Sequence, residues 1–202
     1  MFDKDYSKKD FIKFWGENGY LETWDGDGRD WSKEIMQLVV NQIGISKDKT
    51  VVEIGCGGGY WTKKLCEHAN HVHAIDIIPS LVISCENYTY YENNDKQFNC
   101  SCIESNSVDF IFSFGVFCHF SQQACEEYLI DFKRILKKGG SGILMYADKK
   151  GLEKFYGIET ANVNDVFGEA IDYNDSEPFV KKHFKNTERI LDFKHALLLI
   201  KN

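Results

Sequence analysis

The chain has 202 residues, 43% hydrophobic and 27% charged, an ordinary balance for one globular domain with a sizeable core. Its formal net charge of -7 argues against a surface that follows the phosphates of DNA or RNA, so we expect no nucleic-acid partner. It contains no apolar run of about 18 residues and starts with charged residues, so we predict no membrane partner and a cytoplasmic location.

The seven cysteines form no recognisable ligand or disulfide pattern. Their number is odd and most fall on apolar positions, so we interpret them as small buried hydrophobic residues. Cys100 and Cys102 are the only close pair, and no second cysteine or histidine pair follows at zinc-ligand spacing. The sequence therefore predicts no metal centre.

Residues 1–45 are predicted to form a helical cap. The aromatic residues of 2–19 have helical spacing, and this helix either packs on the domain or acts as a lid over a ligand. A second helix begins near Asp30 and runs to about Ile43. No linker or repeat interrupts the chain, so we expect residues 1–202 to form one domain.

The most informative stretch starts with a buried strand, predicted by the β-branched residues of Thr50–Ile54. Glycines occupy four of the next five positions, and a helix begins at Tyr60. Bare backbone is thereby presented to a ligand at the carboxyl end of the strand. Tyr60 breaks the dinucleotide spacing Gly-x-Gly-x-x-Gly, and no Gly-Lys-Ser/Thr follows as in a phosphate-binding loop. The pattern that fits is acid-x-Gly-x-Gly-x-Gly, formed by Glu53, Gly55, Gly57 and Gly59.

A second strand is predicted over His71–Asp76, with the acid at its carboxyl end. An acid at this point can accept hydrogen bonds from two ribose hydroxyls, or it can cap the next helix. Pro79 marks the first turn of that helix, which is predicted to be short and to include Cys85. Ile77 and Ile78 would offer an apolar face to adenine.

The third strand has two readings. The preferred one places it at Asn87–Glu92, where aromatic and β-branched residues favour a strand. The other extends the preceding helix to Tyr91 and places the strand at Gln97–Cys100. In the first reading a polar loop follows the strand, and Asn94 and Asp95 become candidates to bind an adenine amino group, with Asn99 as the alternative.

A continuous apolar run from Phe110 to Phe114 predicts a central strand buried on both faces. His119 follows its carboxyl end. A helix is predicted over Gln122–Leu136, with Gly139 and Gly140 ending it in the left-handed conformation. A fifth strand, Ile143–Ala147, then places Tyr146 and Asp148 at its end.

The apolar pattern weakens over residues 149–178, which we interpret either as a substrate-side insertion or as a plain surface crossover. A last helix is predicted at Ser176–Lys185. Two strands, Arg189–Phe193 and Ala196–Ile200, would form an antiparallel edge.

The order of these motifs resembles the class I S-adenosylmethionine (SAM) dependent methyltransferases, in particular compact bacterial small-molecule enzymes. The resemblance implies an α/β fold: a three-layer αβα sandwich around a mostly parallel seven-stranded sheet, order 3-2-1-4-5-7-6, with an antiparallel C-terminal hairpin. It also implies SAM as cofactor and S-adenosylhomocysteine (SAH) as product. The residues implied to bind the cofactor are Glu53, Gly55, Cys56, Gly57, Tyr60, Trp61, Asp76, Ile77, Asn94, Asp95 and Phe114.

The activity implied is methyl transfer to an oxygen or nitrogen of a small polar molecule, in surface-sugar or other secondary biosynthesis. An imidazole suits proton removal from such an acceptor near neutral pH, so His119 is the candidate base and Tyr146 would orient the acceptor. His119 can instead cap the helix after the fourth strand. The alternatives are a non-catalytic SAM-binding or regulatory protein and a methyltransferase acting on protein or RNA. We expect a small-molecule acceptor and a monomer or homodimer.

Overall fold

The computed structural model describes residues 30–43, 47–78, 83–93, 98–117, 120–146, 176–192 and 196–202. Its helices and strands are, in chain order, α3 (Asp30–Ile43), β1 (Thr50–Ile54), α4 (Tyr60–His68), β2 (His71–Asp76), β3 (Tyr88–Glu92), β4 (Val108–Ser113), α5 (Gln122–Ile135), β5 (Leu136–Tyr146), α8 (Ser176–Lys181), β6 (Asn186–Asp192) and β7 (Ala196–Lys201). The predicted helix of residues 2–19 and the predicted insertion up to residue 175 lie outside the described residues.

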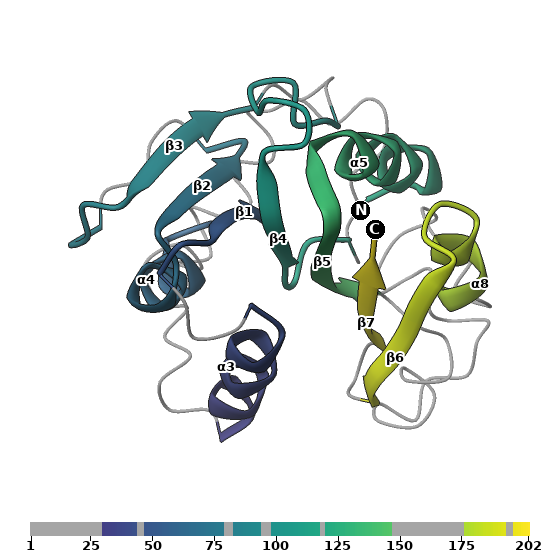
Figure 1. Cartoon of the computed structure of the whole chain (residues 1–202), viewed down its shortest axis with the longest axis horizontal. Coiled ribbons are helices and arrows are strands. Elements are labelled where there is room, and N and C mark those ends of the chain that lie inside the picture. Colours follow the sequence, from purple (N-terminus) through teal and green to yellow (C-terminus); the bar gives the residue numbers. More distant parts are fainter. Residues whose placement is uncertain are drawn as a thin grey trace.

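The strands form one seven-stranded sheet in the order β3-β2-β1-β4-β5-β7-β6 (Figure 1). The first five strands pair in parallel, and β7 is antiparallel to both β5 and β6. The predicted sheet order and C-terminal hairpin are therefore confirmed. The strand order reverses between β1 and β4, and ligands of open α/β sheets bind outside the carboxyl ends of the strands at such a point.

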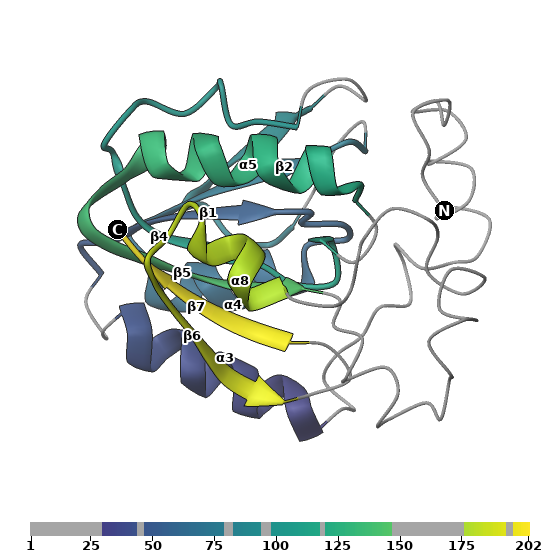
Figure 2. The same ribbon diagram turned by 90° about the vertical axis from the view of Figure 1, so that its right-hand side faces the viewer.

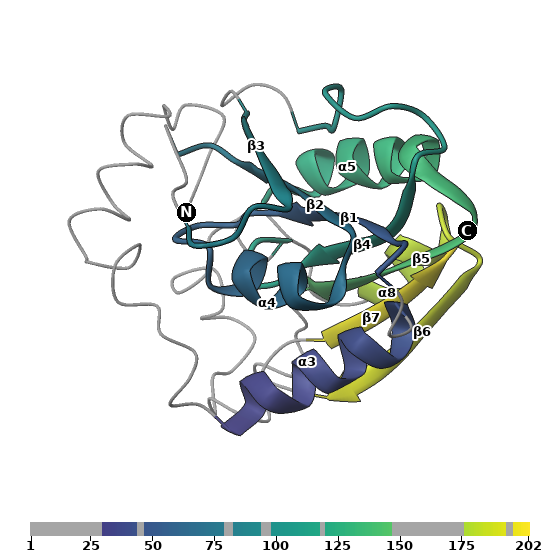
Figure 3. The ribbon, with the colours of Figure 1, turned by 60° about the vertical axis from the view of Figure 1, so that its left-hand side comes forward.

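Helices cover both faces of the sheet, as a three-layer sandwich requires. In Figure 2, α5 and α8 lie on one face, while α3 and α4 lie on the other, and Figure 3 shows the second pair on the same side from another angle. Helix α4 contacts β2 and helix α3 contacts β5. The described part of the predicted N-terminal cap, α3, is thus a layer helix packed on the sheet.

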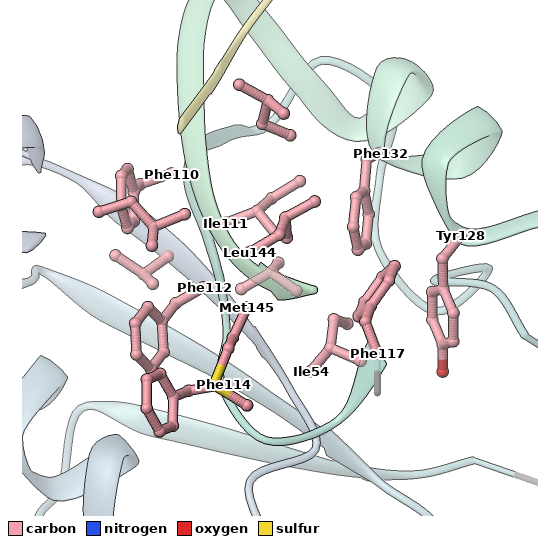
Figure 4. Packing of buried hydrophobic residues seen from close by; sticks show 14 of the residues in the cluster. Ile54, Phe110, Ile111, Phe112, Phe114, Phe117, Tyr128, Phe132, Leu144 and Met145 are labelled. Atoms are coloured by element: carbon pink, nitrogen blue, oxygen red, sulfur yellow. The ribbon is translucent and has the colours of Figure 1, made fainter. Parts of the chain in front are cut away.

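The core is centred on β4, which is buried on both faces as its apolar run predicted. None of the side chains from Phe110 to Phe114 is more than 8% exposed. In Figure 4 the rings of Phe110, Phe112 and Phe114 lie on one side of the strand, and those of Phe117 and Phe132 on the other. Phe110, Phe112 and Phe114 share one side because the pleat of a strand sends successive side chains to opposite faces.

The third strand confirms the preferred reading, since β3 occupies Tyr88–Glu92 and residues 98–100 are not a strand. The predicted helix after Pro79 is wrong at its end, because residues 83–87 are not helical and Cys85 lies in a loop. The side chain of Asn87 donates hydrogen bonds to carbonyls at the end of α4. These bonds hold the loop in an irregular path into β3.

The junction after α5 is a second correction. The helix ends at Ile135, and its C-cap, Leu136, already has extended dihedrals of φ -65° and ψ 132°. Strand β5 therefore begins at Leu136 instead of Ile143, and the predicted termination of the helix by Gly139 and Gly140 is wrong.

These glycines instead allow β5 to pair closely with β4. Gly139 has the expected left-handed φ of 80°, but inside the strand, where the register with β4 shifts. A Cβ on Gly140 would lie 3.2 Å from the carbonyl oxygen of Asp109 in β4, and one on Gly142 would lie 2.9 Å from that of Ile111. Side chains at these positions would push the two strands apart.

The C-terminal elements differ from the prediction in their bounds. Helix α8 ends at Lys181 instead of Lys185, and β6 begins at Asn186 instead of Arg189. The reason is a turn after α8, in which the Thr187 hydroxyl donates a hydrogen bond to the carbonyl oxygen of Phe184 at 2.6 Å. This bond directs the chain into β6.

No helix among the described residues is long and apolar enough to cross a membrane. The same ranges hold no group of three or more His, Cys, Asp or Glu side chains placed to bind a metal ion.

Candidate functional site

The loop between β1 and α4 adopts the backbone conformation that glycine permits. Gly55, Gly57 and Gly59 have φ values of 76°, 49° and 84°, a region that L side chains rarely enter. The N–H of Gly55 donates to the carbonyl oxygen of Ile75 at 2.8 Å, and the N–H of Gly59 donates to that of Cys56 at 2.8 Å. The backbone itself therefore fixes both ends of the turn.

Asp76 holds this loop from the end of the neighbouring strand. Its Oδ2 accepts the N–H of Gly57 at 2.7 Å, and its Oδ1 accepts those of Ile77 at 2.6 Å and Ile78 at 3.2 Å. Burial raises the pKa of this carboxyl, and the three N–H donors oppose that shift. The carboxylate thus accepts backbone N–H groups of the glycine loop and of the residues directly after β2. A carboxylate offers about four lone-pair sites, so a ribose hydroxyl could still donate to it, and this role stays a prediction.

Glu53 lies beneath the glycine loop. It is 1% exposed, and Thr62 Oγ1 donates a 2.6 Å hydrogen bond to its Oε2. Burial raises the pKa of Glu53 to about 8, the Thr62 hydrogen bond lowers it, and the nearby Asp76 carboxylate raises it further. One buried carboxyl group, Glu53, and one half-buried carboxyl group, Asp76, therefore lie at this edge, and a bound cation would stabilise their ionised forms. The positive sulfonium and ammonium groups of SAM have the charge that such a site favours.

The first turn of α4 packs against the end of β4. The Trp61 ring lies 5.3 Å from that of Phe112 and 5.2 Å from that of Phe114, and Trp61 is 3% exposed. Tyr60 is half-buried, and its ring lies edge-on to that of Trp61, with 5.1 Å between the ring centroids. Lys64 Nζ lies over the Tyr60 ring. Trp61 and Phe114 are therefore core residues beside the loop, and their predicted contact with the cofactor remains a prediction.

Cys56 and Ile77 flank the loop on the β2 side. Cys56 is buried beside Ala74, and burial raises the pKa of its thiol, so its contribution is that of a small apolar side chain. Ile77 is half-buried and directly follows Asp76. Its predicted contact with adenine is consistent with this position.

The loop leaving β4, where the sequence analysis placed Phe114 and His119, adjoins the glycine loop. A Cβ on Gly55 would lie 2.1 Å from Val116 Cγ2, so the β4 exit packs directly on the glycine loop. Gly115 has a φ of 74°, and a Cβ there would meet no atom of the described residues within 4 Å. Among these residues, space is therefore open beside the point where β1 and β4 end side by side.

Other residues of the site were also missed. Thr62 anchors Glu53, and its spacing of three and four residues from the apolar Leu65 and Cys66 was the signal that could have revealed a buried polar contact. Asn93 follows β3: its N–H donates to the carbonyl oxygen of Asp76 at 2.7 Å, and its side chain donates to Tyr128 Oη at 3.3 Å. No sequence pattern marked Asn93, because both contacts are long-range.

The residues predicted for catalysis are only partly described. Tyr146 ends β5 and is 1% exposed, with its ring 6.1 Å from that of Phe117 and 6.0 Å from that of Phe179. It lies in the aromatic part of the core on the α5 face. His119, Asn94 and Asp95 lie outside the described residues.

The sheet order, the glycine loop after β1 and the acid at the end of β2 define the Rossmann-like fold of class I SAM-dependent methyltransferases. Residues 52–144 match the family model described as a methyltransferase domain. This stretch of the chain is therefore similar to a methyltransferase domain.

Three similar proteins illustrate the relationship. A phosphoethanolamine N-methyltransferase of Triticum aestivum is 30% identical over 123 residues, or 57% of this chain and 24% of that protein. A solved structure of Haemonchus contortus phosphoethanolamine N-methyltransferase 1, with phosphoethanolamine and SAH, has a TM-score of 0.66 at 19% identity and covers 96% of this chain and 48% of that one. The N-methyltransferase NodS of Bradyrhizobium japonicum with SAH has a TM-score of 0.61 at 16% identity and covers 90% of this chain and 94% of that one.

This chain thus spans about a quarter of the length of the wheat relative. The two structural likenesses establish the fold.

Proposed function

We propose that the domain transfers the methyl group of SAM to a nitrogen of a small polar molecule. The observation that supports this most is the meeting of the glycine loop, Asp76 and the β4 exit at one edge of the sheet, with space open among the described residues beside Gly115. The sequence left oxygen and nitrogen acceptors open. Nitrogen is favoured because the three similar proteins described above are all named N-methyltransferases.

In this proposal the chain binds the cofactor mainly through the backbone of the glycine loop and the carboxylate of Asp76. SAM supplies a methyl group on a positively charged sulfur. The bare backbone of Gly55 and Gly57 would approach its methionine and ribose parts, and Asp76 would accept a ribose hydroxyl. Ile77 would pack on adenine, and Asn94 or Asp95 would bind the adenine amino group.

The acceptor would be held on the β4 side of the site. An amine reacts only in its neutral form, with its lone pair directed at the methyl carbon, so positioning and proton removal are the chain's two tasks. The absence of a side chain on Gly115 would leave room for the acceptor. His119 is the proposed base and Tyr146 the proposed orienting residue.

Calorimetry with SAH, and with NAD as a control, tests the cofactor. We expect SAH to bind and NAD not to bind. Asp76→Ala should weaken SAH binding by about 10- to 100-fold, the loss typical of hydrogen bonds to a charged group. Glu92→Gln is the matched control, because Glu92 is an exposed acid paired in register with Asp76 on β3. Equal SAH affinity in both variants would remove Asp76 from the site.

The acceptor is tested by SAM consumption with phosphoethanolamine, other small primary amines and their hydroxyl analogues. We expect methylated amine products. Methylation of the hydroxyl analogues alone would overturn the preference for nitrogen. SAH binding without turnover of any acceptor would favour the alternative of a non-catalytic SAM-binding protein.

A further inference from the structure

Two thiols, one in α4 and one in the loop before β3, take no part in the proposed methyl transfer. Cys66 Sγ in α4 and Cys85 Sγ in the loop before β3 are 2.8 Å apart. Cys66 is buried, whereas Cys85 is half-buried. Burial also raises the pKa of the Cys66 thiol, which disfavours its nucleophilic thiolate. A soluble oxidant would therefore meet Cys85 first.

The approach of the two segments has a cause that does not involve sulfur. Asn87, two residues after Cys85, donates from Nδ2 to carbonyl oxygens at the end of α4. These belong to Cys66 at 3.0 Å, Ala69 at 3.0 Å and Asn70 at 3.4 Å. The last carbonyls of a helix have no partner within the helix, so this side chain satisfies them and fixes the loop to α4. The proximity of the thiols is thus built into the backbone packing.

We propose that Cys66 and Cys85 are an oxidisable pair that forms a reversible intrachain disulfide when the protein meets a peroxide. A disulfide bond is about 2.05 Å long, so the two sulfur atoms need to approach by less than about 1 Å. For these two positions, this revises the interpretation of the cysteines on apolar positions as small buried hydrophobic residues. The proposal does not depend on methyl transfer.

The oxidation balances with hydrogen peroxide as the only co-reactant. The Cys85 thiolate attacks one peroxide oxygen, the O–O bond breaks, and hydroxide leaves, giving a sulfenic acid at Cys85. The sulfur of Cys66 then attacks the sulfenic sulfur, the S–O bond breaks, and the oxygen leaves as water with the thiol proton. Two electrons pass from the sulfur pair to the peroxide. A small thiol such as glutathione reverses the bond by thiol–disulfide exchange.

The bond would close a covalent loop around the cofactor side of the site, because the chain from Cys66 to Cys85 contains β2 and Asp76. Cross-linking a loop of this length restricts the unfolded chain. We therefore expect the oxidised protein to melt at a temperature higher by roughly 5–10 °C.

Peptide mass spectrometry of the whole chain tests the site. Trypsin releases residues 65–96 as one peptide, because no lysine or arginine lies between Lys64 and Lys96, and it holds Cys66, Cys85 and no other cysteine. After hydrogen peroxide and then iodoacetamide, we expect this peptide two hydrogens lighter and unalkylated. Reduction by glutathione should restore two alkylated sites. The melting temperature is measured on the same samples.

Two variants separate the pair from general oxidation. Cys85→Ser should abolish both the light peptide and the rise in melting temperature, whereas Cys102→Ser, which changes an exposed cysteine, should leave both unchanged. If residues 65–96 keep two alkylated cysteines at a peroxide dose that oxidises Cys102, the proposal is overturned. A disulfide that lowers the melting temperature would overturn the inference that the native backbone accommodates the bond.

Discussion

Glu53 is the side chain whose charge the fold changes most clearly. Its carboxyl is buried under the glycine loop, and burial raises its pKa from 4.5 to about 8. Between these values the folded protein keeps a proton that the unfolded chain has released. The folded state then binds more protons, so the free energy of unfolding falls as the pH rises from about 5 to about 8.

Glu53→Gln should remove most of this pH dependence. Glutamine keeps an oxygen that can accept the Thr62 hydroxyl but does not ionise. In the wild type the free energy of unfolding should fall by up to about 1.4 kcal/mol per pH unit in this window. The variant should show a much flatter profile in urea titrations at pH 5 to 8. A residual slope is expected from Asp76, whose pKa is also raised by burial.

Glu67→Gln is the control, because Glu67 is an exposed acid of α4 close in sequence. It should keep the wild-type slope. If Glu53→Gln also keeps it, Glu53 is ionised in the folded protein and its burial is compensated by other groups.

Two connecting elements, the glycine loop and the β4 exit, are packed on one another through Gly55 and Val116. An added Cβ on Gly55 would overlap Val116 Cγ2, and the φ of 76° would strain any L side chain. These two costs are separable, because only the overlap depends on Val116.

Gly55→Ala should destabilise the fold by roughly 2–4 kcal/mol. The double variant with Val116→Ala should recover part of this loss, giving a favourable coupling of about 1–2 kcal/mol in a double-mutant cycle measured by urea unfolding. Gly58→Ala should be tolerated, since Gly58 is exposed and lacks the positive φ of its neighbours. Strict additivity of the two substitutions would show that the loops do not press on each other.

The segment between β3 and β4 is fixed to α5 by Arg134. Its guanidinium donates to the carbonyl oxygens of Ile103 at 2.9 Å and Cys100 at 2.9 Å, and it pairs with Asp131, which also accepts the N–H of Cys100. One planar side chain thus holds two points of the segment, a geometry that lysine does not reproduce.

Arg134→Ala and Arg134→Lys should both speed amide hydrogen exchange in residues 100–107 by about 10-fold or more, the effect of losing at least one charge-assisted hydrogen bond. Lys133→Ala, at an exposed neighbouring position of α5, should change nothing. If amide exchange in residues 100–107 of Arg134→Lys is as slow as in the wild type, the planar guanidinium is not required to hold the segment.

For the molecule as a whole, stability comes from a sheet whose central strands are covered on both faces. Strand β7 is an example: Ala196 to Ile200 are each at most 2% exposed, between the antiparallel partners β5 and β6. Leu198 is fully buried there, while Ile130 of α5 is 58% exposed.

Leu198→Ala should cost about 2–5 kcal/mol in free energy of unfolding, because it leaves a cavity in the core. Ile130→Ala removes a similar side chain from the surface and should stay within about 0.5 kcal/mol of the wild type. Thermal and urea unfolding of the two variants provide the comparison. Similar losses would indicate that α5 is covered by a part of the chain outside the described residues.

The sequence by itself determined where most of the strands lie, including the third. These depend on local signals, β-branched and apolar runs, which act within a few residues, where backbone conformation and side-chain periodicity decide the outcome. The sheet order was implied by the resemblance that the order of the motifs carries, and the structure confirmed it. The prediction from sequence was wrong where a glycine can serve two purposes, as at Gly139, which can end a helix or bend a strand.

Only the tertiary structure decided which groups meet across the sheet. The hydrogen bond from Gly57 to Asp76, the burial that raises the pKa of Glu53 and the packing of Val116 on Gly55 all depend on contacts between different strands or loops. The contact between Cys66 and Cys85 likewise depends on how Asn87 binds the end of α4. Such contacts depend on packing geometry, which no short-range pattern encodes, and they set the charge and chemistry of the site.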